Sequence, residues 1–333
     1  MRQHCAAIIG AAAVFVGLLL NLGCDACLTG PDSAVSDAAL GSDAALGSDA
    51  GPLPDAGVLS DAGPPDGGCA TSMFMSAEAV PMVNTGYNDT SPSISADGLM
   101  LYFSRDPWDP DSGAPPAIWV ASRPDTSSLF ESPTVLTDLD PLTSLESPNI
   151  SFDGLSLYFG HNQGIWVATR PDTFSAFGDP VELAEVNSPD WDFAPSISAD
   201  GLTLYLASTR PGGAGGLDIW TATRADTGSL FSPPENLTEI NTPDDDDGPD
   251  ISPDSRTLYF RSFSTAWPSG RILASTRAVP EGPFGEPRQV LDLDAFCADT
   301  SPSVSADGST LYFTRYAGPD DDIWFATRDC GDP

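Results

Sequence analysis

The chain repeats one unit of about 50 residues five times, and this feature limits the fold more than any other. Each unit holds a Pro-Ser-Ile-Ser-like segment, a turn, a Leu-Tyr-Phe-like run and an Ile-Trp-Val-like run that ends in arginine. The turn aspartates are Asp97, Asp153, Asp200, Asp254 and Asp307. Alternating residues, aromatic runs and Asp-Gly pairs predict short strands joined by tight hairpins. Ser255 replaces the glycine of the fourth turn, so we expect that turn either to differ from the others or to carry some strain.

A fourth segment of the type Phe-x-x-Pro-x-x-aliphatic follows each of the first four units, and its proline is typical of an outer strand. These segments begin at Phe130, Phe177, Phe231 and Phe284. The fifth unit ends at Arg328 without one, whereas Phe74-x-x-Ala77-x-x-Val80 stands alone before the first unit. We therefore predict an all-β fold for residues 69–333: a five-bladed β-propeller of four-stranded antiparallel blades, closed by an N-terminal outer strand.

Two cysteines flank this predicted closure. Cys69 precedes the N-terminal outer strand and Cys330 follows the last arginine, so they occupy the two halves of an interrupted hairpin turn. A Cys69–Cys330 disulfide would fasten the ends of the ring and requires an oxidising compartment. Cys297 as an alternative partner, or free thiols, remain open.

The N-terminus predicts export. Arg2 precedes a nearly unbroken apolar run to Leu22, so residues 1–23 are typical of a signal peptide. The ending Leu-Asn-Leu-Gly-Cys24 resembles a bacterial lipobox, which implies lipid attachment to Cys24, with simple secretion as the alternative. Residues 24–68 are rich in Asp, Ala, Gly and Pro and predict a disordered tether. We expect a protein exported to the bacterial cell envelope, in the periplasm or at the outer membrane or cell surface.

The repeats resemble the WD40-like or PD40 propeller repeats of the TolB family. The pattern Pro-Ser-Ile-Ser-x-Asp-Gly, Leu-Tyr-Phe, Asp-Ile-Trp carries this resemblance and is most complete from Pro195 to Arg224. The resemblance implies a periplasmic or envelope location and protein partners bound at one propeller face. TolB proteins also carry a separate N-terminal domain, where this chain has only the tether.

Composition excludes several functions. The chain has 48 Asp and Glu against 13 basic residues, all arginine, for a formal net charge of -35. Such a polyanion is unsuited to nucleic acids, and we expect membrane association only through the N-terminal lipid. Beyond the signal peptide, His161 is the single histidine, so His-rich zinc sites are excluded and any Ser-His-Asp chemistry must use that residue.

One predicted face of the propeller carries charge in every repeat. An acid precedes each inner strand and a base follows each second strand, which favours either acid–base pairs within each blade or a charged binding rim around the central funnel. The acids are Asp89, Glu146, Asp192, Asp246 and Asp299, and the bases are Arg105, His161, Arg210, Arg261 and Arg315. Loops of variable length on this face add Trp108, Trp191 and Trp267 as candidate contacts. The strand tryptophans Trp119, Trp166, Trp220 and Trp324 recur at one position and are interpreted as packing residues.

We expect no catalytic residue, no metal and no cofactor, although aspartate runs at 109–111, 244–247 and 320–322 leave calcium as a possibility. The predicted function is a monomeric, non-catalytic envelope lipoprotein that binds or scaffolds, engaging a protein or a glycan through one propeller face. The alternative is a glycosidase or lyase that uses carboxylates in the funnel. The five acids look alike in sequence, whereas such enzymes need carboxylates in unlike environments.

Overall fold

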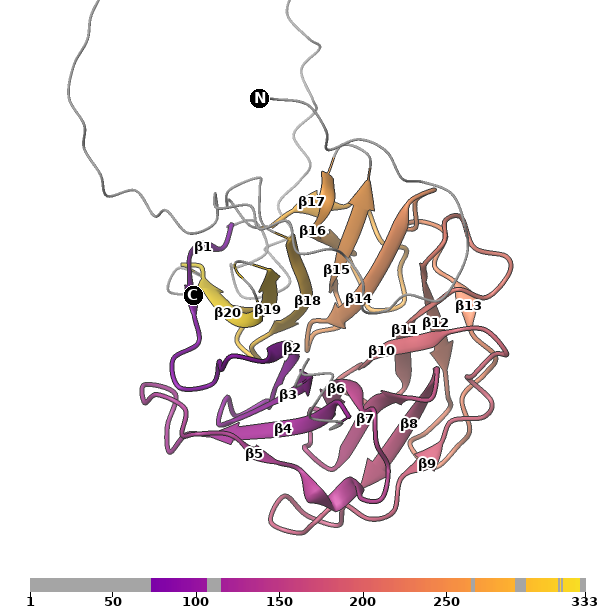
Figure 1. The fold of residues 1–333 in the computed structure, drawn as a ribbon. Helices are drawn as coiled ribbons and strands as arrows, with labels where there is room; N and C mark the ends of the chain where they lie inside the picture. Colours follow the sequence, from indigo (N-terminus) through magenta and orange to yellow (C-terminus); the bar gives the residue numbers. More distant parts are fainter. Residues whose placement is uncertain are drawn as a thin grey trace, which may run out of the picture.

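The computed structural model describes residues 73–106, 115–264, 267–290, 298–316, 318 and 320–329. Five four-stranded antiparallel sheets surround a central axis (Figure 1), so the predicted five-bladed propeller is confirmed. We name the blades by their strands: blade 1 is β2–β5, blade 2 is β6–β9, blade 3 is β10–β13, blade 4 is β14–β17, and blade 5 is β18–β20 with β1. No helix of the described part is long and apolar enough to cross a membrane.

The strands have the following bounds, from the axis outward. The inner strands are β2 (Asn88–Ile94), β6 (Glu146–Ile150), β10 (Asp192–Ile197), β14 (Asp245–Ile251) and β18 (Ala298–Val304). The second strands are β3 (Met100–Asp106), β7 (Ser156–His161), β11 (Thr203–Ser208), β15 (Thr257–Ser264) and β19 (Thr310–Tyr316). The third strands are β4 (Ala117–Ser122), β8 (Gly164–Thr169), β12 (Asp218–Thr223), β16 (Trp267–Thr276) and β20 (Asp321–Thr327). The outer strands are β5 (Thr134–Val135), β9 (Val181–Glu182), β13 (Glu235–Asn236), β17 (Arg288–Gln289) and β1 (Met75–Ala79).

The ring closes as the repeats predict. β1 pairs with β20, the third strand of blade 5, and lies beside it in Figure 1. Phe74 is fully buried, and its ring lies 4.5 Å from the guanidinium carbon of Arg328. The N-terminal segment therefore supplies the outer strand that the fifth unit lacks. Cys69, Cys297 and Cys330 lie outside the described residues, as do the predicted signal peptide, Cys24 and the tether.

The apolar core lies between the blades. In one cluster, Tyr158 of blade 2 packs with Leu204, Leu206 and Trp220 of blade 3. Burial of such side chains is the main favourable term in folding, so each blade depends on its neighbours for stability.

An arginine at the end of each third strand joins two blades. Arg224 Nε donates to Gly201 O of its own hairpin turn (2.7 Å), and Nη2 donates to Tyr158 OH of blade 2 (3.2 Å). Its guanidinium carbon lies 4.4 Å from the centroid of the Phe231 ring. A planar group with several fixed donors can make all three contacts, whereas an ammonium cannot. The guanidinium–ring contact recurs at Arg123, Arg170, Arg277 and Arg328.

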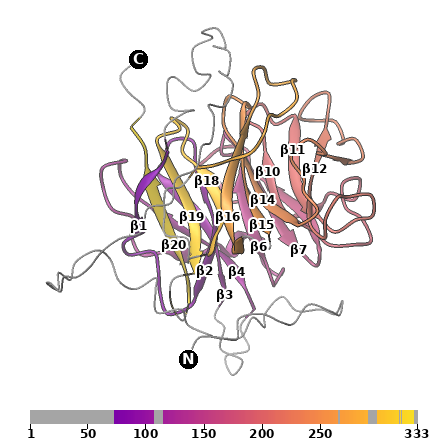
Figure 2. The ribbon, with the colours of Figure 1, turned by 90° about the horizontal axis from the view of Figure 1, so that it is seen from above.

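The two faces of the propeller follow from this topology (Figure 2). We call the face with the Asp-Gly turns the hairpin face. Its turn glycines Gly98, Gly154, Gly201 and Gly308 have φ between 70° and 72°, and Ser255 adopts φ 57° without being glycine. The fourth turn is thus left-handed like the others, which costs more for serine because of its Cβ. We call the opposite face, where each inner strand begins, the funnel face.

Candidate functional site on the funnel face

Four of the predicted bases pair with an acid of their own blade. Arg105 lies 2.6 Å from Asp89, Arg210 lies 2.5 Å from Asp192 and Arg315 lies 2.7 Å from Asp299. Arg261 pairs with Asp247. The carboxylates of Asp89 and Asp192 are fully buried, so these pairs are enclosed within the blades and do not form an open charged rim.

Three of the four paired arginines also stack on the strand tryptophans. The guanidinium carbon of Arg105 lies 4.4 Å from the Trp119 ring centroid, and that of Arg315 lies 4.9 Å from Trp324. In blade 2, His161 takes this place, with its ring 5.3 Å from that of Trp166. Arg210 contacts Trp220 at 5.2 Å. These contacts place the strand tryptophans in the packing of blades 1, 2, 3 and 5, whereas in blade 4 the guanidinium carbon of Arg261 lies 5.9 Å from the Phe263 ring centroid.

The buried acids hold the loop that enters their blade. Asp89 Oδ2 accepts hydrogen bonds from the backbone N and the hydroxyl of Thr85, and Asp192 Oδ2 accepts the same pair from Ser188. Arg105 Nη2 donates to Val83 O of the same incoming segment. Buried charges are tolerated where they are paired and hydrogen-bonded, so these groups are structural members of the face.

Blade 4 departs from this arrangement. We expected Asp246 to face Arg261, but Arg261 lies opposite Asp247, and Asp246 lies opposite Ser262. Asp246 is fully buried, and its Oδ1 has no hydrogen-bond partner in the described part of the chain. Burial raises the pKa of Asp246, and the nearby Asp218 carboxylate also raises it. The cause is the position of the arginine in β15. Because alternate residues of a strand face opposite sides of the sheet, a shift of one residue brings the arginine opposite the neighbouring acid.

Blade 2 has no acid–base pair between Glu146 and His161, contrary to the pairing interpretation. Glu146 lies opposite Gly160, and a Cβ on Gly160 would approach Glu146 Cγ to 2.9 Å, so the glutamate lies directly over this glycine. Within the described residues its carboxylate has no hydrogen bond or ion pair, and burial raises its pKa. His161 Nε2 is hydrogen-bonded to Asn162, and its buried Nδ1 has no partner among the described residues.

Aromatic side chains are present on the same face. Trp191 is half-buried just before β10, with its ring 6.2 Å from that of Phe193. Tyr87 before β2 is 44% exposed and Tyr316 at the end of β19 is 37% exposed. Our sequence reasoning missed these two tyrosines, although their positions next to the strands match those of the tryptophans it selected. Trp108 and the side chain of Trp267 lie outside the described residues.

Two of the three aspartate runs lie mostly in strands, and the run at 109–111 lies outside the described residues. Asp245 to Asp247 lie in β14, and Asp321 and Asp322 begin β20. The pKa of Asp322 is raised to about 6 by burial and by the charges of Asp89, Asp320 and Asp321. Among the described residues, no group of three or more His, Cys, Asp or Glu side chains has the geometry to hold a metal ion.

No protein-family profile and no curated protein sequence matches the chain. Among solved structures, it is similar to the α-L-arabinofuranosidase PaAbf62A of Podospora anserina, with 12% identity, 78% of this chain and 97% of that chain covered, and a TM-score of 0.56. It is also similar to an α-L-arabinofuranosidase of Lactobacillus brevis, with 15% identity, coverages of 77% and 95%, and a TM-score of 0.53. A putative TolB of Agrobacterium tumefaciens matches with 20% identity, coverages of 77% and 84%, and a TM-score of 0.48.

These identities show a shared fold and no more, yet they correct one expectation. We expected a protein without catalytic activity. That expectation is wrong, because this propeller architecture does not indicate it: several similar propellers are glycoside hydrolases. The structural ground for the expectation also fails. The acids of the funnel face are not five equivalent groups, since Asp89, Asp192, Asp247 and Asp299 have an arginine partner and Glu146 and Asp246 have none.

Proposed function

We propose that this protein binds a glycan at the funnel face, as an exported component of the bacterial cell envelope. The observation that carries the proposal is the combination of exposed or half-buried aromatic rings (Tyr87, Trp191, Tyr316) with carboxyl groups in unlike environments on one face. A sugar ring presents apolar C–H faces that pack on aromatic rings, and its hydroxyls donate to carboxylates. The net charge of -35 favours neutral or amino-bearing glycans over acidic ones.

The test is binding of the full exported protein to a panel of envelope and plant-type polysaccharides, measured by affinity electrophoresis and calorimetry. Trp191→Ala should weaken binding of the recognised glycan at least about tenfold, the loss expected for a removed aromatic contact at a binding site. Phe174→Ala is the matched control, because Phe174 is 99% exposed in the loop between β8 and β9 on the hairpin face. Equal effects of the two variants, or no binding to any glycan, would contradict the proposal.

A second candidate is carboxylate-dependent hydrolysis of the bound glycan, and the environment of Glu146 favours it. A general acid must be protonated near neutral pH, and a half-buried carboxyl without a basic partner tends toward that state. Asp247 beside Arg261 offers a carboxylate of a different kind on the same face. Glu146→Gln should abolish any polysaccharide cleavage while leaving glycan binding, whereas the exposed Glu131→Gln should change neither. Cleavage that survives Glu146→Gln would exclude this role.

The envelope location is part of the proposal and is supported by the signal-like N-terminus and its lipobox-like ending at Cys24. Cys24→Ser should move the protein from the membrane fraction to the soluble exported fraction. An unchanged distribution of this variant would argue against the lipid anchor.

A further inference from the structure

A closed belt of hydrogen bonds surrounds the axis below the funnel. In each inner strand, one polar side chain accepts a hydrogen bond from a backbone N–H of the next blade. The acceptor–donor pairs are Ser93 with Ile150 N (3.0 Å), Asn149 with Ile197 N (3.0 Å), Ser196 with Ile251 N (3.1 Å), Asp250 with Val304 N (2.8 Å) and Ser303 with Ile94 N (3.2 Å). Serine and asparagine fulfil this role in four blades, so the belt requires only a neutral acceptor.

Asp250 is the one charged group in this belt. Its residue is 7% exposed, and Oδ2 is used by Val304 N. Oδ1 has no hydrogen-bond partner among the described residues. Burial raises the pKa of Asp250 to about 7. A carboxylate in place of serine therefore places an unused acceptor, and a charge that is costly to bury, next to the axis.

This acceptor opens into a pocket on the axis at the hairpin face. The pocket has a volume of about 50 Å³. Its walls include the β-branched side chains that follow the belt residues, which are Ile94, Ile150, Ile197, Ile251 and Val304. Asp250 is the only titratable side chain among the lining residues, and none of them is basic.

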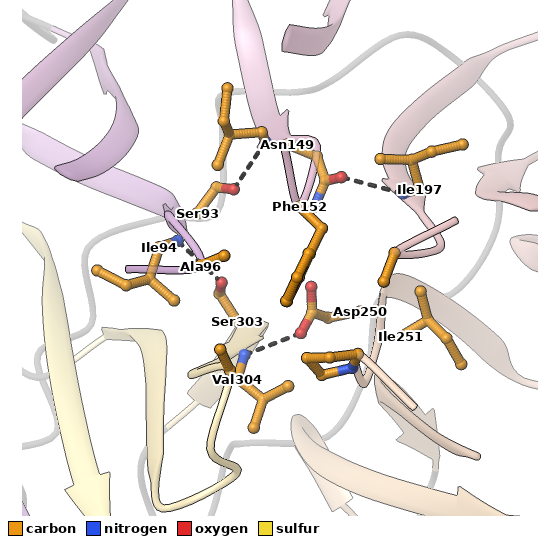
Figure 3. A pocket seen from close by; sticks show the side chains of 14 residues that line it. Ser93, Ile94, Ala96, Asn149, Phe152, Ile197, Asp250, Ile251, Ser303 and Val304 are labelled. Carbon is orange, nitrogen blue, oxygen red and sulfur yellow. Dashed lines mark hydrogen bonds between the residues drawn. The ribbon is translucent and has the colours of Figure 1, made fainter. Parts of the chain in front are cut away.

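Phe152 is the second departure from the repeat. At the corresponding turn position the other blades have Ala96, Ala199, Pro253 and Ala306, all of which also line the pocket. Phe152 is 47% exposed, and Figure 3 shows its side chain and that of Asp250 pointing toward one another across the pocket. An exposed aromatic ring at the mouth and a carboxylate at the base come from blades 2 and 4.

The chemistry of these groups selects a cation with an apolar stem. A carboxylate forms its strongest hydrogen bonds with charged N–H donors, and an aromatic face attracts cations. The apolar walls suit methylene groups, and the volume accommodates only a few water-sized groups, which favours a compact ammonium over a planar guanidinium. The chain has no lysine, so a lysine ligand must come from another molecule.

We propose that this axial pocket binds the side-chain ammonium of a lysine presented by a partner protein, with Asp250 as the anionic acceptor and Phe152 covering the methylene stem. The site lies on the face opposite the proposed glycan site and does not depend on it.

The test uses the full protein and the pentapeptide Gly-Gly-Lys-Gly-Gly, with chemical-shift perturbation as the measurement. The peptide should bind, whereas the same peptide with arginine or norleucine in place of lysine should not. Asp250→Asn should weaken binding by at least about tenfold through loss of the charged acceptor. Phe152→Ala should weaken binding roughly three- to tenfold through loss of the ring that covers the methylene stem. Binding should be stronger at about pH 8.5 than at about pH 5.5, because the carboxylate form is required.

Matched variants separate this site from general surface charge. Asn149 already occupies the equivalent belt position in blade 2, so Asp250→Asn should fold, and Asp250→Ser reproduces the other three blades. Asp179→Asn removes an exposed charge and Phe174→Ala an exposed ring of the hairpin face, and neither should alter binding. Unchanged binding in Asp250→Asn, or equal binding of the norleucine peptide, would overturn the proposal. Binding of Ca²⁺ or of butylammonium in preference to the lysine peptide would also overturn it, in favour of an inorganic cation or a small-molecule amine.

Discussion

Asp250→Asn should make the protein more stable at alkaline pH, although it removes a charged residue from the axial belt. Asparagine keeps an oxygen acceptor for Val304 N, in the arrangement that Asn149 shows with Ile197 N at 3.0 Å. What the substitution removes is a carboxylate whose charge is largely desolvated in the folded protein.

The magnitude follows from the pKa of Asp250, which burial raises from its ordinary value of 3.8 to about 7. Between these two values the folded state holds a proton that the unfolded state has released, so the free energy of unfolding falls as pH rises. The stabilising effect of the raised pKa is fully present below 3.8 and is lost above about 7. About three pKa units at about 1.4 kcal/mol each give a cost of up to about 4 kcal/mol at pH 8. For a domain of this size, that corresponds to roughly 8–15 °C in Tm.

Thermal unfolding of both proteins at pH 5 and pH 8.5 measures this effect. The gain in Tm of Asp250→Asn should be large at pH 8.5 and small at pH 5, whereas Asp179→Asn, which removes an exposed charge, should show no such difference. A gain that is equal at both pH values, or a loss of stability at pH 8.5, would refute the assignment of Asp250 as a buried carboxylate with a raised pKa.

Three further substitutions test the scaffold. Arg224→Lys should lower the free energy of unfolding, measured in urea, by about 2–3 kcal/mol, because lysine cannot reach Gly201 O and Tyr158 OH together. The control Arg288→Lys, on the exposed outer strand β17, should leave the free energy of unfolding unchanged. Arg105→Leu should lower the free energy of unfolding by about 3–5 kcal/mol at pH 8, because it leaves Asp89 buried without its partner. This loss of stability should become smaller on acidification, as Asp89 takes up a proton. A loss of stability that does not change with pH would contradict this cause. Ser255→Gly should stabilise by roughly 0.5–1 kcal/mol through relief of its φ of 57°, and a decrease in Tm would show that the turn is unstrained.

The sequence predicted the architecture because each blade repeats its own local signals. The Asp-Gly turns, the Leu-Tyr-Phe runs and the isolated Phe74 segment fix the number of strands and the closure without reference to distant contacts. The contacts between blades were not predictable in this way. Nothing local indicates that Arg224 reaches Tyr158, because the distance between them in the chain is long and the contact depends on the packing of two sheets.

Register was the main error within the site. Aligned on their prolines Pro92, Pro148 and Pro249, the repeats place Glu146 and Asp247 at the position of Thr90, one residue after that of Asp89 and Asp246. That alignment would have shown that Glu146 is not equivalent to Asp89. In blade 4 the shifted residue is the arginine, because Arg261 directly follows Phe260 whereas Arg105 stands two residues after Phe103, so Arg261 faces Asp247 in place of Asp246.

The five-fold repeat itself distinguishes scaffold from site. A residue that recurs in every blade, such as the arginine over the phenylalanine that precedes the outer strand, has a contact that every blade needs. The fold does not require an aspartate at position 250, because serine makes the same belt contact in three blades and avoids the cost of burying a charge. Variants of scaffold residues should lose stability and binding together, since the face unfolds with the blade. Asp250→Asn should gain stability and lose the lysine ligand, and only a residue retained for binding at the expense of folding gives that combination.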